Sequence, residues 1–229
     1  MKCRTYSGLA AAALILCLAG LGAAQSEVKK LEVGVQFTSF TLFPPPREGF
    51  QPPSVTEPGF GGRFTYNLTN RIAVESELNF FPHKNIFQFL GDGRALQGQF
   101  GIKFGKRFKK FGVFAKGRPG FLRLGKGDFR MRPALCPGDI PEPIGCFDPV
   151  AKTSFAFDAG GIVEYYPNKR LVVRFDAGDT ILHFGERLAV TSVPALNPGV
   201  TIPFKIGLLG APAETTHNFQ GSIGVGFRF

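Results

Sequence analysis

Three histidines are the side chains best suited to chemistry near neutral pH in this sequence. His83, His183 and His217 could each act as a base, and a nucleophilic serine needs such a base within hydrogen-bond reach. No serine follows His183 closely, and the first serine after His217 is Ser222. We therefore expect three loop histidines, with no catalytic residue and no metal site.

Ten charged residues form the second set with chemical potential, because they alternate with apolar residues. Five are basic and five are acidic, and glycines lie among them. This balance suits a narrow interior in which buried charges must pair. The predicted network consists of Arg63, Glu75, Glu77, Lys103, Lys116, Arg118, Asp158, Glu164, Arg174 and Asp176.

Strands must position these charges, because the alternation of apolar and polar residues has a period of two. The 30 glycines and 26 phenylalanines also favour strands and turns over helices. Eight segments show the alternation, and they are Lys30–Phe40, Gly59–Leu68, Arg71–Phe81, Ala95–Lys106, Phe111–Leu122, Ser154–Tyr166, Leu171–Leu182 and Glu214–Phe229.

Short and long connections alternate between these segments, as in an up-and-down barrel with both termini at one rim. The sequence thus predicts an all-β fold, a single eight-stranded antiparallel transmembrane barrel. Ten strands result if Pro82–Arg94 or Val200–Leu209 also pair. The short connections are Thr69–Asn70, Lys106–Lys110 and Pro167–Arg170, and the long ones are Thr41–Pro58, Pro82–Arg94, Arg123–Thr153 and His183–Ala213.

The first residues have the three-part layout of a secretory signal peptide. Lys2 and Arg4 precede the apolar run Leu9–Leu21, and Gly22–Ala24 offers small residues for cleavage. An uncleaved anchor is the alternative, but a spanning helix needs about 20 apolar residues. We expect residues 1–24 to be removed, leaving 25–229 as the barrel domain of an exported protein.

Two cysteines, Cys136 and Cys146, remain after this cleavage, with nine residues between them. An even number in an oxidising compartment predicts one disulfide. A metal pair is the alternative, but no histidine lies near them in the sequence. The sequence therefore suggests neither a metal nor another cofactor.

Basic residues gather in two of the short connections, and the formal net charge is +10. In a cytosolic protein this charge would suggest nucleic acid, but export argues against that partner. A cationic rim would suit anionic phospholipid headgroups, whereas a solvated turn that resists aggregation explains it equally well. The residues are Lys106, Arg107, Lys109, Lys110, Lys169 and Arg170.

The C-terminal segment ends on an aromatic residue, with apolar residues at alternate positions before it. These positions are Phe219, Ile223, Val225, Phe227 and Phe229, interrupted by Gly221. With the signal peptide, this pattern resembles the small outer-membrane β-barrel proteins of the OmpA/OmpX type. The resemblance implies location in the bacterial outer membrane, contact with its lipids, and recognition of the terminal motif by the barrel-assembly machinery.

Function is then expected to reside in the long outer loops, because side chains fill the interior of an eight-stranded barrel. We expect a monomeric, non-enzymatic protein with a closed polar lumen and a role in envelope integrity or surface interaction. One alternative is a lipid-modifying hydrolase with its site on the rim, as some similar barrels have. Another is a soluble periplasmic, lipocalin-like binder of an apolar ligand.

Overall fold

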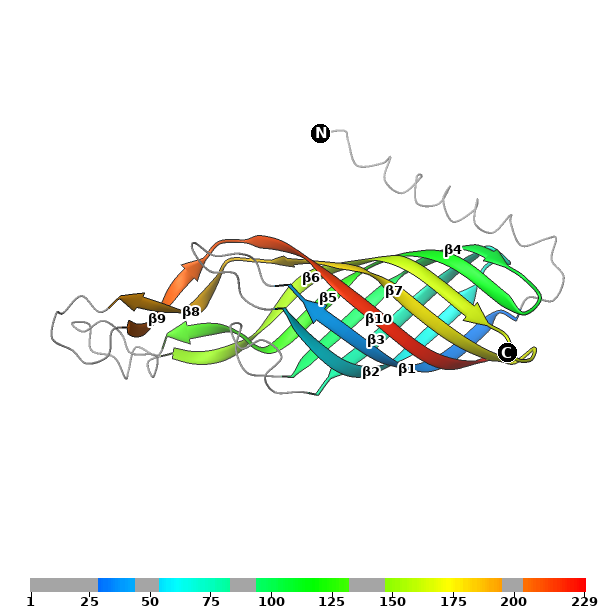
Figure 1. The fold of residues 1–229 in the computed structure, drawn as a ribbon, viewed down its shortest axis with the longest axis horizontal. Coiled ribbons are helices and arrows are strands. Elements are labelled where there is room, and N and C mark those ends of the chain that lie inside the picture. Colours follow the sequence, from blue (N-terminus) through cyan, green and yellow to red (C-terminus); the bar gives the residue numbers. More distant parts are fainter. Residues whose placement is uncertain (1–28, 44–53, 83–93, 132–146, 195–203) are drawn as a thin grey trace, which may run out of the picture.

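Eight antiparallel strands close into a barrel in the computed structural model, which describes residues 29–43, 54–82, 94–131, 147–194 and 204–229 (Figure 1). Each lies over one of the eight segments that alternation predicts. The barrel strands are β1 (Leu31–Leu42), β2 (Val55–Asn67), β3 (Ile72–Phe81), β4 (Ala95–Arg107), β5 (Phe111–Met131), β6 (Phe147–Tyr165), β7 (Leu171–Phe184) and β10 (Glu214–Arg228).

The barrel closes between β1 and β10, which pair from Glu32↔Arg228 to Thr41↔Phe219. Around the barrel the order is β1-β10-β7-β6-β5-β4-β3-β2, so apart from this closure the strands from β1 to β7 each pair with the next strand in the sequence. A separate antiparallel hairpin of β8 (Arg187–Pro194) and β9 (Phe204–Ala211) is inserted between β7 and β10. The predicted eight-stranded barrel is confirmed, and the hairpin brings the described strands to ten without entering it.

Three short turns and the ends Lys29 and Phe229 lie at one end of the barrel, which we name the turn rim (Figure 1). Side-chain oxygens build two of these turns. Thr69 Oγ1 accepts from the backbone N–H groups of Arg71 and Ile72, and Asn168 Oδ1 accepts from those of Arg170 and Leu171. Such local bonds replace strand pairing where the chain reverses.

The opposite end, the loop rim, carries longer structure (Figure 1). β5 and β6 continue past their predicted limits, Leu122 and Ser154, and pair as far as Met131↔Phe147. Their register shifts between Leu124 and Asp128, so the alternation that reveals a strand is broken there. The sequence pattern therefore underestimated both strands, and it did not predict β8.

Side chains alternate between the two faces of the barrel wall, except where the register of β5 shifts between Leu124 and Asp128. Val35 is 64% exposed on the outside, whereas its neighbour Gln36 is 5% exposed inside. The outer face is apolar and rich in phenylalanine, such as Phe60, Phe100 and Phe104. Among the residues that the structure describes, no helix has the length and apolar character to cross a membrane.

Candidate functional site: the filled interior of the barrel

All ten charged residues of the predicted network are buried inside the barrel. Arg118 is one centre of it, because four carboxylates surround its guanidinium, three of them within 3.4 Å. Its Nη1 lies 2.6 Å from Glu77 Oε2, and its Nη2 lies 2.5 Å from Asp158 Oδ2 and 3.4 Å from Asp176 Oδ2. Lys116 also pairs with Asp158, at 2.7 Å, and with Asp176. We name these residues, together with Arg174, Glu75, Lys103 and Glu164, the charged centre.

Arg174 forms a second centre closer to the turn rim. Its two terminal nitrogens lie 2.5 and 3.0 Å from the carboxylate oxygens of Glu75, across the lumen, and Nη2 lies 2.7 Å from Asp176 Oδ2. Lys103 lies 3.3 Å from Glu75 and also pairs with Glu164. Asp176 pairs with both arginines, and Glu75 Oε2 also lies 3.8 Å from Arg118 Nη1, so the charges form one connected network.

Glycines make room for these long side chains on the inner face. A Cβ at Gly61 would lie 2.1 Å from Asn79 Oδ1, and a Cβ at Gly101 would lie 2.2 Å from the backbone oxygen of Gly117. Even an alanine would overlap at both positions. The inward glycines therefore set the width that the network can occupy.

The network extends toward the turn rim, where it takes in three residues that the sequence prediction missed, Glu32, Arg228 and Tyr166. Arg63 lies 3.5 Å from Glu32 Oε1, and Arg228 Nε lies 3.9 Å from Glu32 Oε2. Tyr166 donates its hydroxyl to Glu164 Oε2 at 2.6 Å. The alternation could have predicted Glu32 and Arg228, because both occupy the alternate positions of their strands whose side chains point inward.

Toward the loop rim, amides and hydroxyls replace most of the charges, although Glu57 is buried there opposite Phe40. Gln36 and Asn79 are bonded at 2.8 Å, and Asn79 also donates to Gln97 Oε1 at 2.9 Å. Gln97 exchanges bonds with Gln220 across the lumen, and Thr180 donates to Gln220 Oε1. Most bonds in this layer join uncharged groups, and Asn79 connects it to the charged centre by donating to Glu77 Oε1 at 2.7 Å.

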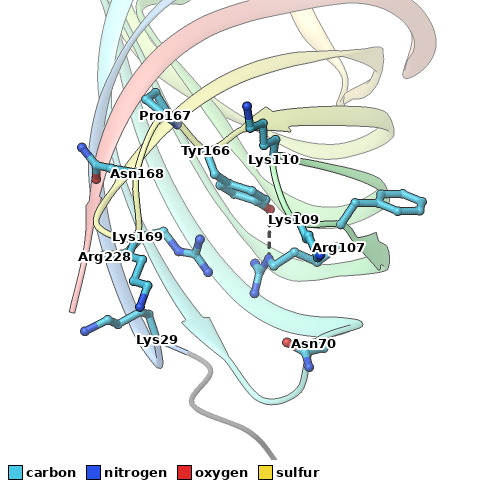
Figure 2. Close-up of a pocket in the computed structure, with 11 residues that line it drawn as sticks. Lys29, Asn70, Arg107, Lys109, Lys110, Tyr166, Pro167, Asn168, Lys169 and Arg228 are labelled. Carbon is cyan, nitrogen blue, oxygen red and sulfur yellow. Dashed lines mark hydrogen bonds between the residues drawn. The ribbon is translucent and has the colours of Figure 1, made fainter.

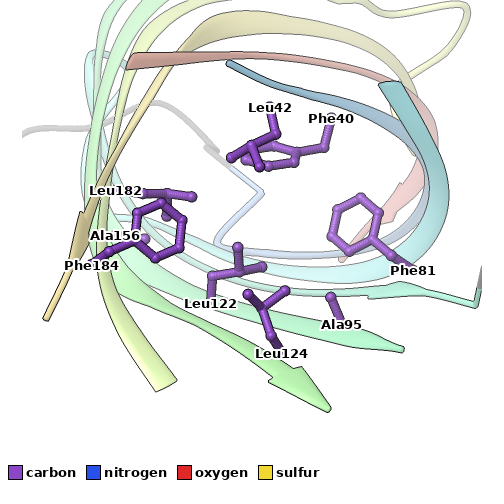
Figure 3. Packing of buried hydrophobic residues seen from close by; sticks show 9 residues of the cluster. All are labelled: Phe40, Leu42, Phe81, Ala95, Leu122, Leu124, Ala156, Leu182 and Phe184. Atoms are coloured by element: carbon purple, nitrogen blue, oxygen red, sulfur yellow. The ribbon is translucent and has the colours of Figure 1, made fainter. Parts of the chain in front are cut away.

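The mouth at the loop rim is filled by an apolar cluster, which we name the apolar plug (Figure 3). Phe40 and Phe81 meet there with ring centroids 5.9 Å apart. The sequence prediction of a polar lumen did not include this cluster. Its members, all at most 5% exposed, are Phe40, Leu42, Phe81, Ala95, Leu122, Leu124, Ala156, Leu182 and Phe184.

His183 and His217 lie on strands β7 and β10, on the outer face near the loop rim, and not in loops as predicted. His83 lies outside the described residues. His217 Nδ1 is 2.6 Å from Asp179 Oδ2, and His183 Nδ1 is 3.1 Å from Thr215 Oγ1. No bond between a histidine and a serine is found in the described part of the chain. Nor do its residues include a cluster of three or more His, Cys, Asp or Glu that could hold a metal ion.

The remaining predicted sites are divided between the outer face and undescribed segments. Phe219, Ile223, Val225, Phe227 and Phe229 all point outward and are exposed. Cys136 and Cys146, and the predicted signal peptide of residues 1–24, lie outside the described residues.

No family model matches this sequence, and no curated protein matches it either. Solved barrels are similar to its structure at 11% identity. Neisserial surface protein A matches over 87% of this chain and 97% of its own, with a TM-score of 0.49. Ail of Yersinia pestis matches over 88% and 100% with a TM-score of 0.44, and the N-terminal barrel of Pseudomonas aeruginosa OprF over 86% and 97% with a TM-score of 0.41.

At this level of similarity, the class of protein follows from the barrel's own geometry. An apolar outer face around a charged interior is the organisation of a barrel whose wall faces lipid. A soluble lipocalin-like barrel requires the reverse, so that alternative does not fit. The fold is that of a small eight-stranded transmembrane barrel, the architecture implied by the resemblance to OmpA/OmpX-type proteins.

Proposed function

We propose that this protein is a non-enzymatic outer-membrane barrel with a closed interior, which stabilises the envelope and presents its loop rim as an interaction surface. The observation that carries the proposal is the continuous filling of the interior. The charged centre, the amide layer and the apolar plug occupy successive levels of the barrel. A barrel filled in this way serves as a scaffold rather than a passive pore.

The turn rim then faces the periplasm and the loop rim faces outward. Short periplasmic turns and long outer loops are the usual arrangement of such barrels. Export through the predicted signal peptide would leave the N-terminus on the periplasmic side. Lipids of the outer membrane are the partner of the apolar outer face.

The loop rim supports the surface role, because its projecting elements are tied together. Lys152 Nζ on β6 lies 3.0 Å from Asp128 Oδ2 on β5 and donates to the backbone oxygen of Glu186 at 2.9 Å. One lysine thereby links the β5–β6 extension to the start of the β8–β9 hairpin. Because these projecting elements are fixed to each other, they can present a binding surface that loses little conformational entropy on binding.

Conductance in planar lipid bilayers tests the closed interior. We expect the reconstituted wild-type protein to give no stable open-channel current. The triple variant Phe40→Ala, Phe81→Ala, Leu122→Ala, which removes bulk from the apolar plug, is the comparison for leakage. Sustained unitary currents from the wild type would contradict the proposal.

Labelling of single cysteines tests the orientation, in a background where Cys136 and Cys146 are serines. A membrane-impermeant maleimide should label Lys126→Cys, at the loop rim, on intact cells. It should label Lys109→Cys, at the turn rim, only after the outer membrane is permeabilised. The opposite pattern would reverse the proposed orientation.

Assembly by the barrel-assembly machinery is proposed from the terminal motif. Phe229 is 59% exposed, and its ring packs edge-on against Phe227 with centroids 5.0 Å apart. Deletion of Phe229 should lower the amount of folded barrel in the outer membrane, measured by heat-modifiability on gels. Phe229→Tyr, which keeps an aromatic end, is the matched control. Equal levels of folded protein for the deletion and the wild type would count against this role.

A further inference from the structure

A cavity of about 530 Å³ opens at the turn rim, below the last level of the charged centre (Figure 2). Of its eleven lining residues, six are lysine or arginine and none is aspartate or glutamate. The lysines, among them Lys29, Lys110 and Lys169, stand around its edge. The turn that carries Lys169 is short and is held by Asn168, whose Oδ1 accepts from the backbone N–H groups of Arg170 and Leu171.

Two arginines form the floor of this cavity on either side of Tyr166 (Figure 2). The side chains of Arg107 and Arg228 are 9% and 8% exposed, and their Cζ atoms lie 5.6 and 4.7 Å from the centroid of the Tyr166 ring. Arg107 Nε donates to Tyr166 Oη at 2.9 Å. Burial raises the pKa of Tyr166, and the neighbouring Glu164 carboxylate raises it further, so its hydroxyl stays neutral.

Donors on both arginines remain unused by the described protein atoms. Arg107 Nη1 and Arg228 Nε are buried and have no hydrogen-bond partner among these atoms. The carboxylates that approach the two arginines come from the lumen side and at long range, Glu164 at 3.7 Å and Glu32 at 3.9 Å. Glu164 is already engaged by Lys103 and Tyr166, and Glu32, whose oxygens accept no hydrogen bond from the described atoms, stays too far from Arg228 Nε to bond with it. A buried guanidinium with free donors is costly unless an acceptor completes it.

We propose that this cavity is a binding site for a phosphate group, which Arg107 and Arg228 hold and to which the positive charge of the surrounding lysines adds attraction. Arginine donors match the spacing of phosphate oxygens, and a charge-assisted bond is stronger than a neutral one. The cavity exceeds a bare phosphate in volume, so it has room for an attached polar group such as glycerol.

Two sources of phosphate fit this position. Phe108 lines the cavity, is exposed on the rim and stacks on Phe111 with centroids 4.5 Å apart. This aromatic pair extends the apolar outer face to the edge of the cavity, so the phosphate could belong to an anionic phospholipid of the inner leaflet. A soluble phosphate compound of the periplasm offers the same chemistry.

Calorimetric titration of the folded full barrel with inorganic phosphate, in zwitterionic detergent, tests the site. We expect saturable binding that sulfate competes with and chloride at equal ionic strength does not. Arg107→Gln and Arg228→Gln should each weaken it about tenfold or more, in line with the loss of a charge-assisted bond. Lys106→Gln is the matched control, because Lys106 lies beside Arg107 in the chain but outside the cavity, and it should leave binding nearly unchanged.

Lys169→Gln covers the case in which an arginine variant fails to fold, because Lys169 is exposed on a turn. It should weaken binding more than Lys106→Gln does, with a normal heat-modifiability shift for both. Nanodiscs with and without phosphatidylglycerol identify the source. A bound headgroup predicts weaker apparent phosphate affinity when phosphatidylglycerol is present, and a soluble phosphate predicts no change. Absence of saturable binding, or equal binding by the Arg107→Gln, Arg228→Gln double variant, would overturn the proposal.

Discussion

The charged centre and the apolar plug fill the same barrel with opposite chemistry. Around Arg118, each charge depends on identified partners at 2.5 to 3.4 Å. In the plug, Phe81 depends only on the volume and shape of its neighbours. Removal of one partner leaves a buried charge unpaired and lowers the stability of the barrel strongly. Truncation of an apolar side chain lowers it in proportion to the volume of the cavity left behind. The two regions should therefore respond differently to the same kind of substitution.

The largest effect is expected from Arg118→Leu in the charged centre. Glu77, Asp158 and Asp176 would lose a shared cation, and breaking a buried ion pair costs about 3–5 kcal/mol. Urea titration of the barrel in lipid vesicles measures the free energy of unfolding. Arg123→Leu, at an exposed position on the same strand, should change it little. Similar losses for both variants would show that the network does not stabilise the barrel.

Truncation of the plug comes next, with Phe81→Ala expected to cost about 3 kcal/mol through lost burial and the cavity left behind. Phe81→Leu keeps most of the volume and should cost well under half as much. The same urea titration compares the two. If the leucine variant were as unstable as the alanine variant, shape-tolerant packing would not describe this region.

A smaller effect is expected where glycine makes room for the polar layers. Gly61→Ala should destabilise by about 1–3 kcal/mol, because its methyl group would overlap Asn79 Oδ1 and the backbone oxygen of Leu78. The adjacent Gly62→Ala is the matched control, since its Cβ points outward and meets nothing nearer than 3.9 Å. Thermal unfolding in detergent should separate the pair, and equal midpoints would refute the steric account.

The smallest effect is expected outside both regions, at the exposed His217–Asp179 pair. Exposed ion pairs contribute little, so His217→Ala should shift the unfolding free energy by no more than about 0.5 kcal/mol. Assayed on phospholipid and lipopolysaccharide substrates, the wild type and this variant should both release no fatty acid. Release that depends on His217 would revive the hydrolase hypothesis.

Much of the charged centre was predictable, because strand parity places each charge on one face without tertiary information. Neighbouring-strand partners such as Arg118 and Asp158 then follow from register. The pair of Arg174 with Glu75 does not, since β7 and β3 meet only across the closed lumen. Closure of the barrel is a property of all eight strands together.

The apolar plug was missed for a different reason. Its residues continue the inward parity of their strands, as Leu122 and Leu124 do after Arg118, but near strand ends they stand beside outward apolar residues such as Phe121. Two adjacent apolar residues hide the alternation and look like the end of a strand. Continuing the alternation past these adjacent apolar residues would have predicted that the side chains of the plug point into the barrel.

Spin labels placed one at a time along β10, from position 219 to 227, test the central claim that the apolar face meets lipid and the polar face lies inside. In lipid vesicles, labels at the odd positions should collide readily with oxygen, which concentrates in the bilayer, and poorly with a water-soluble nickel chelate. Inward labels are limited to positions 220 and 222, because Gly224 and Gly226 leave no room for a side chain, and these labels should be shielded from both. Odd positions accessible to the nickel chelate, with even positions accessible to oxygen, would contradict the account.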